Sequence, residues 1–70
     1  MRQIDARGMR CPWPAIRLAR AWRESGGAPL ELQADDPAAE RELTELAKSL
    51  GARIFVIESG EACLFRFLPL

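Results

Sequence analysis

The spacing of apolar residues along the chain alternates between two periods, which predicts alternating strands and helices. Residues 2–6 (RQIDA) form a short strand candidate, and residues 29–34 (PLELQA) place apolar side chains at every second position. Two later segments, 52–58 (ARIFVIE) and 62–68 (ACLFRFL), are rich in the β-branched and aromatic residues that strands favour. Residues 59–61 (SGE) between them are typical of a hairpin turn, because glycine readily adopts a positive φ.

Two other segments carry apolar residues at helical spacing. The first follows Pro12 and Pro14 and stops at residues 25–27 (SGG); its apolar positions are Ala15, Ile16, Leu18, Ala19 and Trp22. For the second we expect Asp36 as the N-cap and Pro37 as the first helical residue, since both suit a helix start. Its apolar stripe runs to a C-cap at Gly51 and consists of Ala39, Leu43, Leu46, Ala47 and Leu50.

The resulting order β-α-β-α-β-β predicts an α+β fold, with residues 1–70 forming a single domain. A two-layer α/β sandwich satisfies this order, with two helices covering one face of a four-stranded mixed sheet. Both βαβ crossovers should be right-handed. Phe55, Phe65 and Phe67 are expected in the core; any that lies on the helix-free face would instead favour self-association or partner binding.

Composition narrows the possible chemistry. The chain has 70 residues, so its core is thin, and ten basic residues balance ten acidic ones, which gives no support for DNA binding. It has no histidine, which excludes Ser-His and Cys-His nucleophile pairs and His-containing zinc sites. We expect no metal, no cofactor and no membrane span. The start of the chain lacks the apolar core of a signal peptide, which predicts a cytoplasmic protein with Cys11 and Cys63 as free thiols.

Cys11 directly precedes Pro12, and this placement predicts a reactive thiol. If Pro12 is the first helical residue, Cys11 is the N-cap, and the helix dipole should lower the pKa of its thiol. Pro12 and Pro14 have no N–H group, so Trp13 would be left as the one donor aimed at sulfur. Basic residues would add positive potential, namely Arg10 and Arg7. The competing interpretation is a buried structural cysteine, which is common in small proteins.

Several other residues allow two interpretations. Trp13 either stands exposed as a contact for a partner protein or folds back over the core. A basic stripe on the first helix is a solvated face or a docking surface for an acidic partner; it comprises Arg17, Arg20 and Arg23. For Cys63 we favour a core position over a resolving thiol. For Asp35 and Asp36 we favour helix capping over paired acid–base or metal chemistry.

Residues 4–14 (IDARGMRCPWP) resemble the signature (L/I)-D-x-x-G-x-x-C-P-x-P of the TusA/SirA-like sulfur-carrier family. Residues 34–37 (ADDP) resemble the start of that family's second helix. Chain length and element order match as well, so the resemblance extends over nearly the whole chain.

This resemblance implies a sulfur relay more than a self-contained enzyme. In the family, the motif cysteine, here Cys11, accepts sulfane sulfur as a persulfide from a cysteine desulfurase or a rhodanese-like donor. It then passes the sulfur to an acceptor protein, for example in tRNA thiolation, molybdenum-cofactor chemistry or sulfur oxidation. Trp13 occupies the variable position of the motif, and the other matched positions are Asp5, Gly8, Pro12 and Pro14.

Two functions of other classes compete with the relay. The same fold could be a regulatory or adaptor module that binds a partner without sulfur chemistry, in which case Trp13 or the arginines would matter and Cys11 would not. Alternatively, Cys11 could cycle through a disulfide with Cys63 or an external thiol, provided that the Cα atoms approach within about 7 Å.

Overall fold

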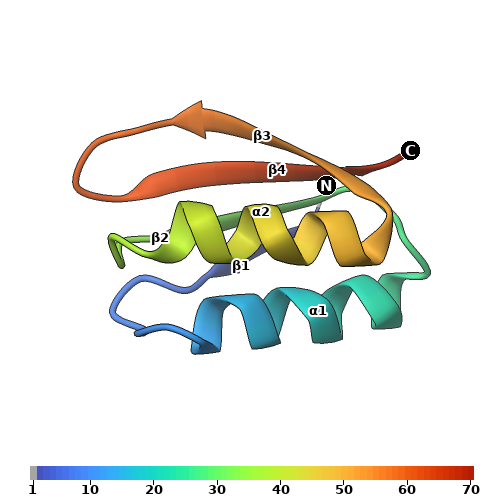
Figure 1. Ribbon diagram of the computed structural model, residues 1–70, viewed down its shortest axis with the longest axis horizontal. Helices are drawn as coiled ribbons and strands as arrows, with labels where there is room; N and C mark the ends of the chain where they lie inside the picture. Colours follow the sequence, from blue (N-terminus) through green and yellow to red (C-terminus); the bar gives the residue numbers. More distant parts are fainter. Residues whose placement is uncertain (1) are drawn as a thin grey trace.

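The computed structural model describes residues 2–70, and its elements follow the predicted order (Figure 1). They are β1 (Arg2–Asp5), α1 (Trp13–Ser25), β2 (Leu30–Ala34), α2 (Ala39–Leu50), β3 (Ala52–Glu58) and β4 (Cys63–Pro69). Both helices lie side by side against one face of the sheet, as the sequence predicts. The α+β, two-layer fold is therefore confirmed. Within residues 2–70 neither helix is long and apolar enough to cross a membrane.

The strands form a mixed sheet in the order β1-β2-β4-β3. β1 pairs parallel to β2, whereas β4 lies antiparallel to both β2 and β3. The last strand thus inserts between β2 and β3, and β1 and β3 form the two edges. The β3–β4 register shifts between Val56 and Glu58, so Ile57 has no directly opposed partner.

The core lies between the sheet and the helices. Phe65 and Phe67 of β4 are fully buried and pair in register with Leu32 and Leu30 of β2. Side chains two residues apart share a face of a strand, so these four point together toward the helices. The helices complete the core with Leu18 and Leu43, both fully buried. The predicted core positions of Phe65 and Phe67 are confirmed.

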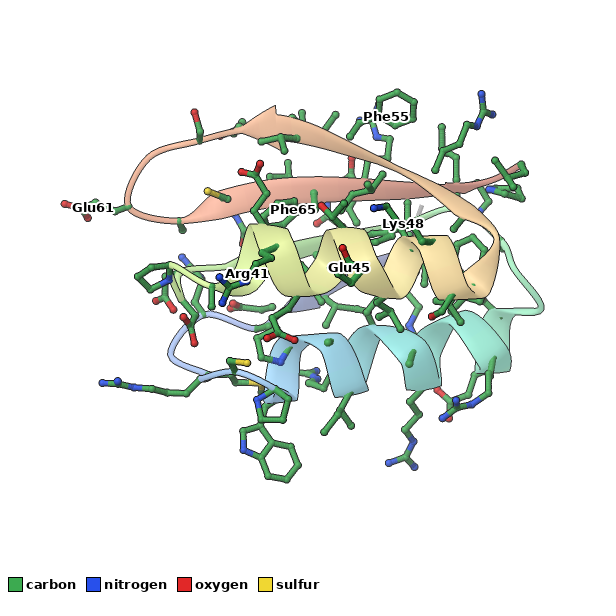
Figure 2. The ribbon with its side chains drawn as sticks, in the orientation of Figure 1. Arg41, Glu45, Lys48, Phe55, Glu61 and Phe65 are labelled. Atoms are coloured by element: carbon green, nitrogen blue, oxygen red, sulfur yellow. The ribbon has the colours of Figure 1, made fainter. Side chains whose placement is uncertain are left out.

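Two predicted core residues lie at the surface instead. Phe55 pairs with Arg66 and lies with it on the sheet face that has no helices, so its side chain is 44% exposed. Figure 2 shows Phe55 projecting away from the helices. Ile16 is 48% exposed, since the sheet and α2 contact the neighbouring helix faces that carry Pro14, Leu18 and Ala21. Ile16 is at the margin of the apolar stripe, so helical spacing alone could not decide whether its side chain is buried or exposed.

The helix-free face carries a polar network across three strands. Glu31 of β2 is only 6% exposed, and its carboxylate accepts hydrogen bonds from Arg66 Nε at 2.9 Å and Nη2 at 2.7 Å. Gln3 Nε2 of β1 donates to the other oxygen at 3.0 Å. This cross-strand network satisfies a carboxylate that would otherwise be costly to bury.

The second helix begins later than predicted. α2 starts at Ala39 with Ala38 as N-cap, rather than with Asp36 as N-cap and Pro37 as first residue. A turn precedes the helix, in which the Asp36 carboxylate accepts the Ala38 N–H at 2.9 Å and the Asp36 carbonyl accepts that of Ala39 at 2.9 Å. Asp36 therefore still supplies a helix-start acceptor. Gly51 ends the helix with φ 67°, as predicted.

Candidate functional site

Cys11 is exposed and lies in the loop between β1 and α1, one residue before the helix N-cap. The N-cap is Pro12, with φ −100° and ψ 16°, and Pro14 is in the first turn. The predictions of Cys11 as N-cap and Pro12 as first helical residue are therefore wrong. The Arg10 carbonyl accepts the Trp13 N–H at 2.9 Å, which closes a turn over residues 10–13 and delays the helix by one residue.

The same hydrogen bond corrects the expected role of the Trp13 N–H, which points to Arg10 O and not to sulfur. The indole of Trp13 is 58% exposed. The structure thus places this aromatic side chain at the surface, two residues from the thiol, and not over the core. Ile16, one turn further along the helix, adds a second exposed apolar side chain.

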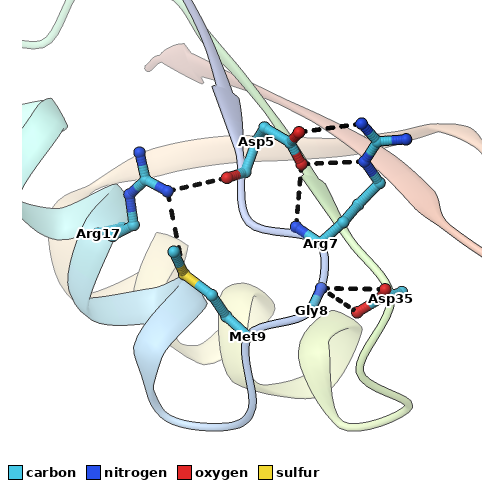
Figure 3. Close-up of polar contacts among 6 residues, drawn as sticks. All are labelled: Asp5, Arg7, Gly8, Met9, Arg17 and Asp35. Atoms are coloured by element: carbon cyan, nitrogen blue, oxygen red, sulfur yellow. Dashed lines mark hydrogen bonds and ion pairs between the residues drawn. The ribbon is translucent and has the colours of Figure 1, made fainter.

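Two carboxylates fasten the Cys11 loop to the segment that precedes α2. The Cys11 N–H donates to Asp36 Oδ2 at 2.6 Å. The Gly8 N–H donates to both oxygens of Asp35, at 2.9 and 3.0 Å, and Figure 3 shows this second contact. Gly8 has φ +81°, a conformation that side-chain-bearing residues rarely adopt. Both carboxylates therefore bind the loop, contacts that the sequence analysis missed, and Asp36 also binds the turn at the helix start. The expected capping by Asp35 is not seen, because its carboxylate binds the Gly8 N–H instead. One carboxylate is enough to accept a hydrogen bond at a helix start. The presence of two adjacent carboxylates was therefore the sequence signal that one of them binds another segment.

The first part of the loop is held by arginines. The Asp5 carboxylate accepts three hydrogen bonds from Arg7, from its N–H and Nε at 3.0 Å and its Nη2 at 2.9 Å. Arg17 Nη1 donates to the Asp5 carbonyl at 2.8 Å and approaches Met9 Sδ at 3.9 Å (Figure 3). The side-chain hydrogen bonds from Arg7 lower the pKa of Asp5 to about 2. Arg7 is thus paired with Asp5, which corrects its expected role beside sulfur.

The nearest charged group to the thiol is a carboxylate from α2. Cys11 Sγ donates to Glu42 Oε1 at 3.0 Å. This hydrogen bond is the main reason that the pKa of Cys11 is raised above its ordinary value; partial desolvation and the negative charges of Glu42 and Asp36 act in the same direction, and Arg41 opposes them. The predicted lowering of the Cys11 pKa is therefore wrong, because the carboxylate of Glu42, 31 residues away in the sequence, raises it.

Cys63 is half-buried at the start of β4 and packs against the core, the position that the sequence favours. Cys11 and Cys63 are both free thiols. Across residues 2–70, no three His, Cys, Asp or Glu side chains gather into a group that could hold a metal ion.

The lowered carboxyl pKa values predict acid sensitivity. Hydrogen bonds lower the pKa of Asp5 through Arg7, of Glu31 through Arg66 and of Asp36 through the Ala38 N–H. A carboxyl whose pKa is lower in the folded state stabilises the fold above its unfolded pKa, 3.8 for Asp and 4.5 for Glu, and this stability is lost as the pH falls through the folded value.

We therefore expect the urea midpoint to be constant from pH 7 to about pH 5 and to fall progressively below that. Urea unfolding followed by circular dichroism at pH 7, 4 and 3 measures this change. The variant Glu31→Gln should show a smaller loss between pH 7 and pH 3 than the parent. A parent protein equally stable at pH 7 and pH 3 would refute the prediction.

The sequence of the chain matches a known protein family and several of its members. The model of the family "Sulfurtransferase TusA" matches residues 2–68. A protein of Archaeoglobus fulgidus named "Putative sulfur carrier protein" is 41% identical over 69 residues, 97% of this chain and 90% of its own. "Putative sulfur carrier protein YrkI" of Bacillus subtilis is 34% identical over 65 residues, 91% of this chain and 85% of its own.

A solved structure agrees with these sequence matches. The crystal structure of a SirA-like protein from Desulfitobacterium hafniense superposes with a TM-score of 0.84, at 26% identity, over 96% of this chain and 95% of that one. The matches extend over both layers of the fold and include the Cys11 loop. The chain therefore belongs to the TusA sulfurtransferase family, and its role is that of a sulfur carrier.

Proposed function

We propose that Cys11 is the carrier residue and that it holds the transferable sulfur as a persulfide. The observation that carries this proposal is an exposed cysteine, on a loop tethered at Gly8 and at Cys11 itself, in a chain of the TusA family. Exposure lets a second protein reach Sγ, and the tethers hold the loop in one place. A fixed, accessible sulfur is what transfer between two proteins needs, because the reacting atoms must be aligned.

The transfer is an exchange between a thiol and a persulfide. The Cys11 sulfur, as thiolate, attacks the outer sulfur of a donor persulfide R–S–S–H; the bond from Sγ to that sulfur forms, and the donor S–S bond breaks. The donor leaves as a thiolate and takes up the proton that Cys11 lost. Cys11–SH and R–S–SH thus become Cys11–S–SH and R–SH, with the donor reduced and Cys11 oxidised by two electrons. An acceptor thiolate then repeats the step on Cys11–S–SH.

The surface beside Cys11 suits contact with a donor and an acceptor protein. Trp13 and Ile16 are 58% and 48% exposed, and exposed aromatic side chains are frequent anchors in protein interfaces. We propose a cysteine desulfurase or a rhodanese-like protein as the donor and a protein thiol as the acceptor. A cytoplasmic location fits this chemistry, since a reducing compartment keeps the Cys11 thiol free.

Loading with a desulfurase tests the proposal. The protein is incubated with a cysteine desulfurase and cysteine, and its intact mass is measured before and after dithiothreitol. We expect a gain of about 32 Da, one sulfur atom, that dithiothreitol reverses. The gain should be located on Cys11 by peptide mapping, persist in Cys63→Ala and vanish in Cys11→Ala.

Two results would contradict the proposal. A mass gain that persists in Cys11→Ala would place the sulfur on another residue. A parent protein that takes up no sulfur from a desulfurase or from a rhodanese-like donor would leave the adaptor function as the better account.

A further inference from the structure

The side-chain contact made by the thiol is with Glu42, a half-buried residue one turn into α2. Cys11 and Glu42 line a narrow crevice with Pro12, Pro14, Ala15 and Ala39, which is too tight to hold a water molecule. The carboxylate and the sulfur meet directly at 3.0 Å beside this crevice. Nothing in the family match or in the exchange step above requires a carboxylate at this place.

We propose that Glu42 is a latch that holds the empty carrier in its thiol form and is released once Cys11 carries a persulfide; the second half rests on the function proposed above. In the empty carrier, Sγ has a proton to donate and the carboxylate accepts it. In the loaded carrier, the inner sulfur has no proton, so this hydrogen bond no longer exists.

Charge adds to the release. A persulfide is a stronger acid than the corresponding thiol, so the loaded Cys11 carries negative charge at a pH where the empty one is neutral. Glu42 and Asp36 both face Cys11 with carboxylates, and Arg41 and Arg10 are the cations nearby. Repulsion from Glu42 directs the outer sulfur away from the crevice and toward the open side of the loop. The same residue thus suppresses thiolate chemistry before loading and exposes the sulfur after it.

The raised pKa of Cys11 agrees with the first half of the latch, because the hydrogen bond to Glu42 is its largest cause. The latch should also slow the reaction of this exposed cysteine with adventitious oxidants, because these attack the thiolate. On this account, a partner that brings a cation to Glu42 would open the latch and supply the thiolate for attack.

The variant Glu42→Gln tests the latch in a Cys63→Ala background, so that one thiol reacts. Iodoacetamide alkylation rates are measured from pH 6 to pH 10. We expect the midpoint of the Glu42→Gln profile to lie at lower pH and the rate at pH 7 to rise about threefold or more, the size of effect that a partly exposed charge contact gives. Thermal melts check that folding is intact.

Glu45→Gln is the matched control, since it removes the same charge from the same helix. Glu45 lies on the outer face of α2 (Figure 2) and is exposed. Its carboxylate pairs with Lys48 Nζ at 3.6 Å. Its alkylation profile should coincide with the parent profile. Equal profiles for the parent and Glu42→Gln, or equal shifts in both variants, would overturn the latch.

A second measurement separates the latch from the carrier function. After loading with a desulfurase and cysteine, the persulfide is ionised with or without Glu42, so we expect the parent and Glu42→Gln to be alkylated at the same rate. A loaded Glu42→Gln protein that is faster by the same factor as the empty one would overturn the release step. Failure of both proteins to load would refute the persulfide proposal, whereas the profiles of the empty protein still decide whether Glu42 holds the thiol.

Discussion

Replacing Phe65 by alanine should lower the free energy of unfolding by about 3–5 kcal/mol, among the largest effects expected of a single substitution in this chain. Phe65 is fully buried in the middle of β4 and pairs with Leu32 of β2 and Val56 of β3, so its loss leaves a cavity in the core between the sheet and the helices. A domain of this size has only about 4–10 kcal/mol of stability in total. We therefore expect a large loss of folded protein at 37 °C, measured by urea and thermal unfolding.

Phe55→Ala provides the matched control because it removes the same side chain from the neighbouring strand. Phe55 is 44% exposed and stands on the helix-free face (Figure 2). Its removal creates no closed cavity and should cost less than about 1.5 kcal/mol. Equal losses of stability in the two variants would contradict the division of the sheet into a buried and a helix-free face.

This difference between two phenylalanines shows what the sequence could predict about the fold. The alternation of apolar residues in β2 and the turn and cap signals at residues 59–61 and Gly51 are local, and they were sufficient for element order and fold class. The face on which Phe55 lies depends instead on the pairing of β3 with β4 and on the insertion of β4 between β2 and β3. Such long-range pairing has no local signature.

The chemistry of the candidate site shows the same limit. Sequence order placed Cys11 beside a proline-rich helix start, and the loop does end at α1. The acidity of the thiol, however, depends on Glu42, which is far away in the sequence and close in space. A helix dipole is a property of one segment and can be predicted, whereas the contact of the Glu42 carboxylate with Cys11 depends on how α2 packs against the Cys11 loop. The predicted direction of the pKa shift failed for this reason.

Asp36 shows both what the sequence could predict and what it could not, because its one carboxylate binds the start of α2 and also the Cys11 loop. Its Oδ1 accepts the Ala38 N–H and its Oδ2 accepts the Cys11 N–H, at 2.9 and 2.6 Å. The local half of this role was predicted from the sequence, and the contact to Cys11 was not. The second contact places Cys11 where Sγ reaches Glu42, so the position of the thiol depends on a residue expected only to cap a helix.

Replacing Asp36 by alanine should therefore free the Cys11 loop from α2. We expect the Cys11 amide to exchange with solvent about tenfold faster or more, because its hydrogen bond goes to a charged acceptor and such bonds are among the strongest in proteins. Sγ should also lose its fixed distance to Glu42, so that alkylation of Cys11 at pH 7 becomes faster. Hydrogen exchange followed by NMR and iodoacetamide kinetics measure the two effects.

Glu40→Ala controls for charge, since Glu40 is an exposed carboxylate in the first turn of the same helix. It should leave both the Cys11 amide exchange and the alkylation rate unchanged. Unchanged exchange in Asp36→Ala would show that the loop holds its position without the carboxylate. Faster exchange with an unchanged alkylation rate would show that Glu42 follows the thiol when the loop moves, which would separate the tether from the latch.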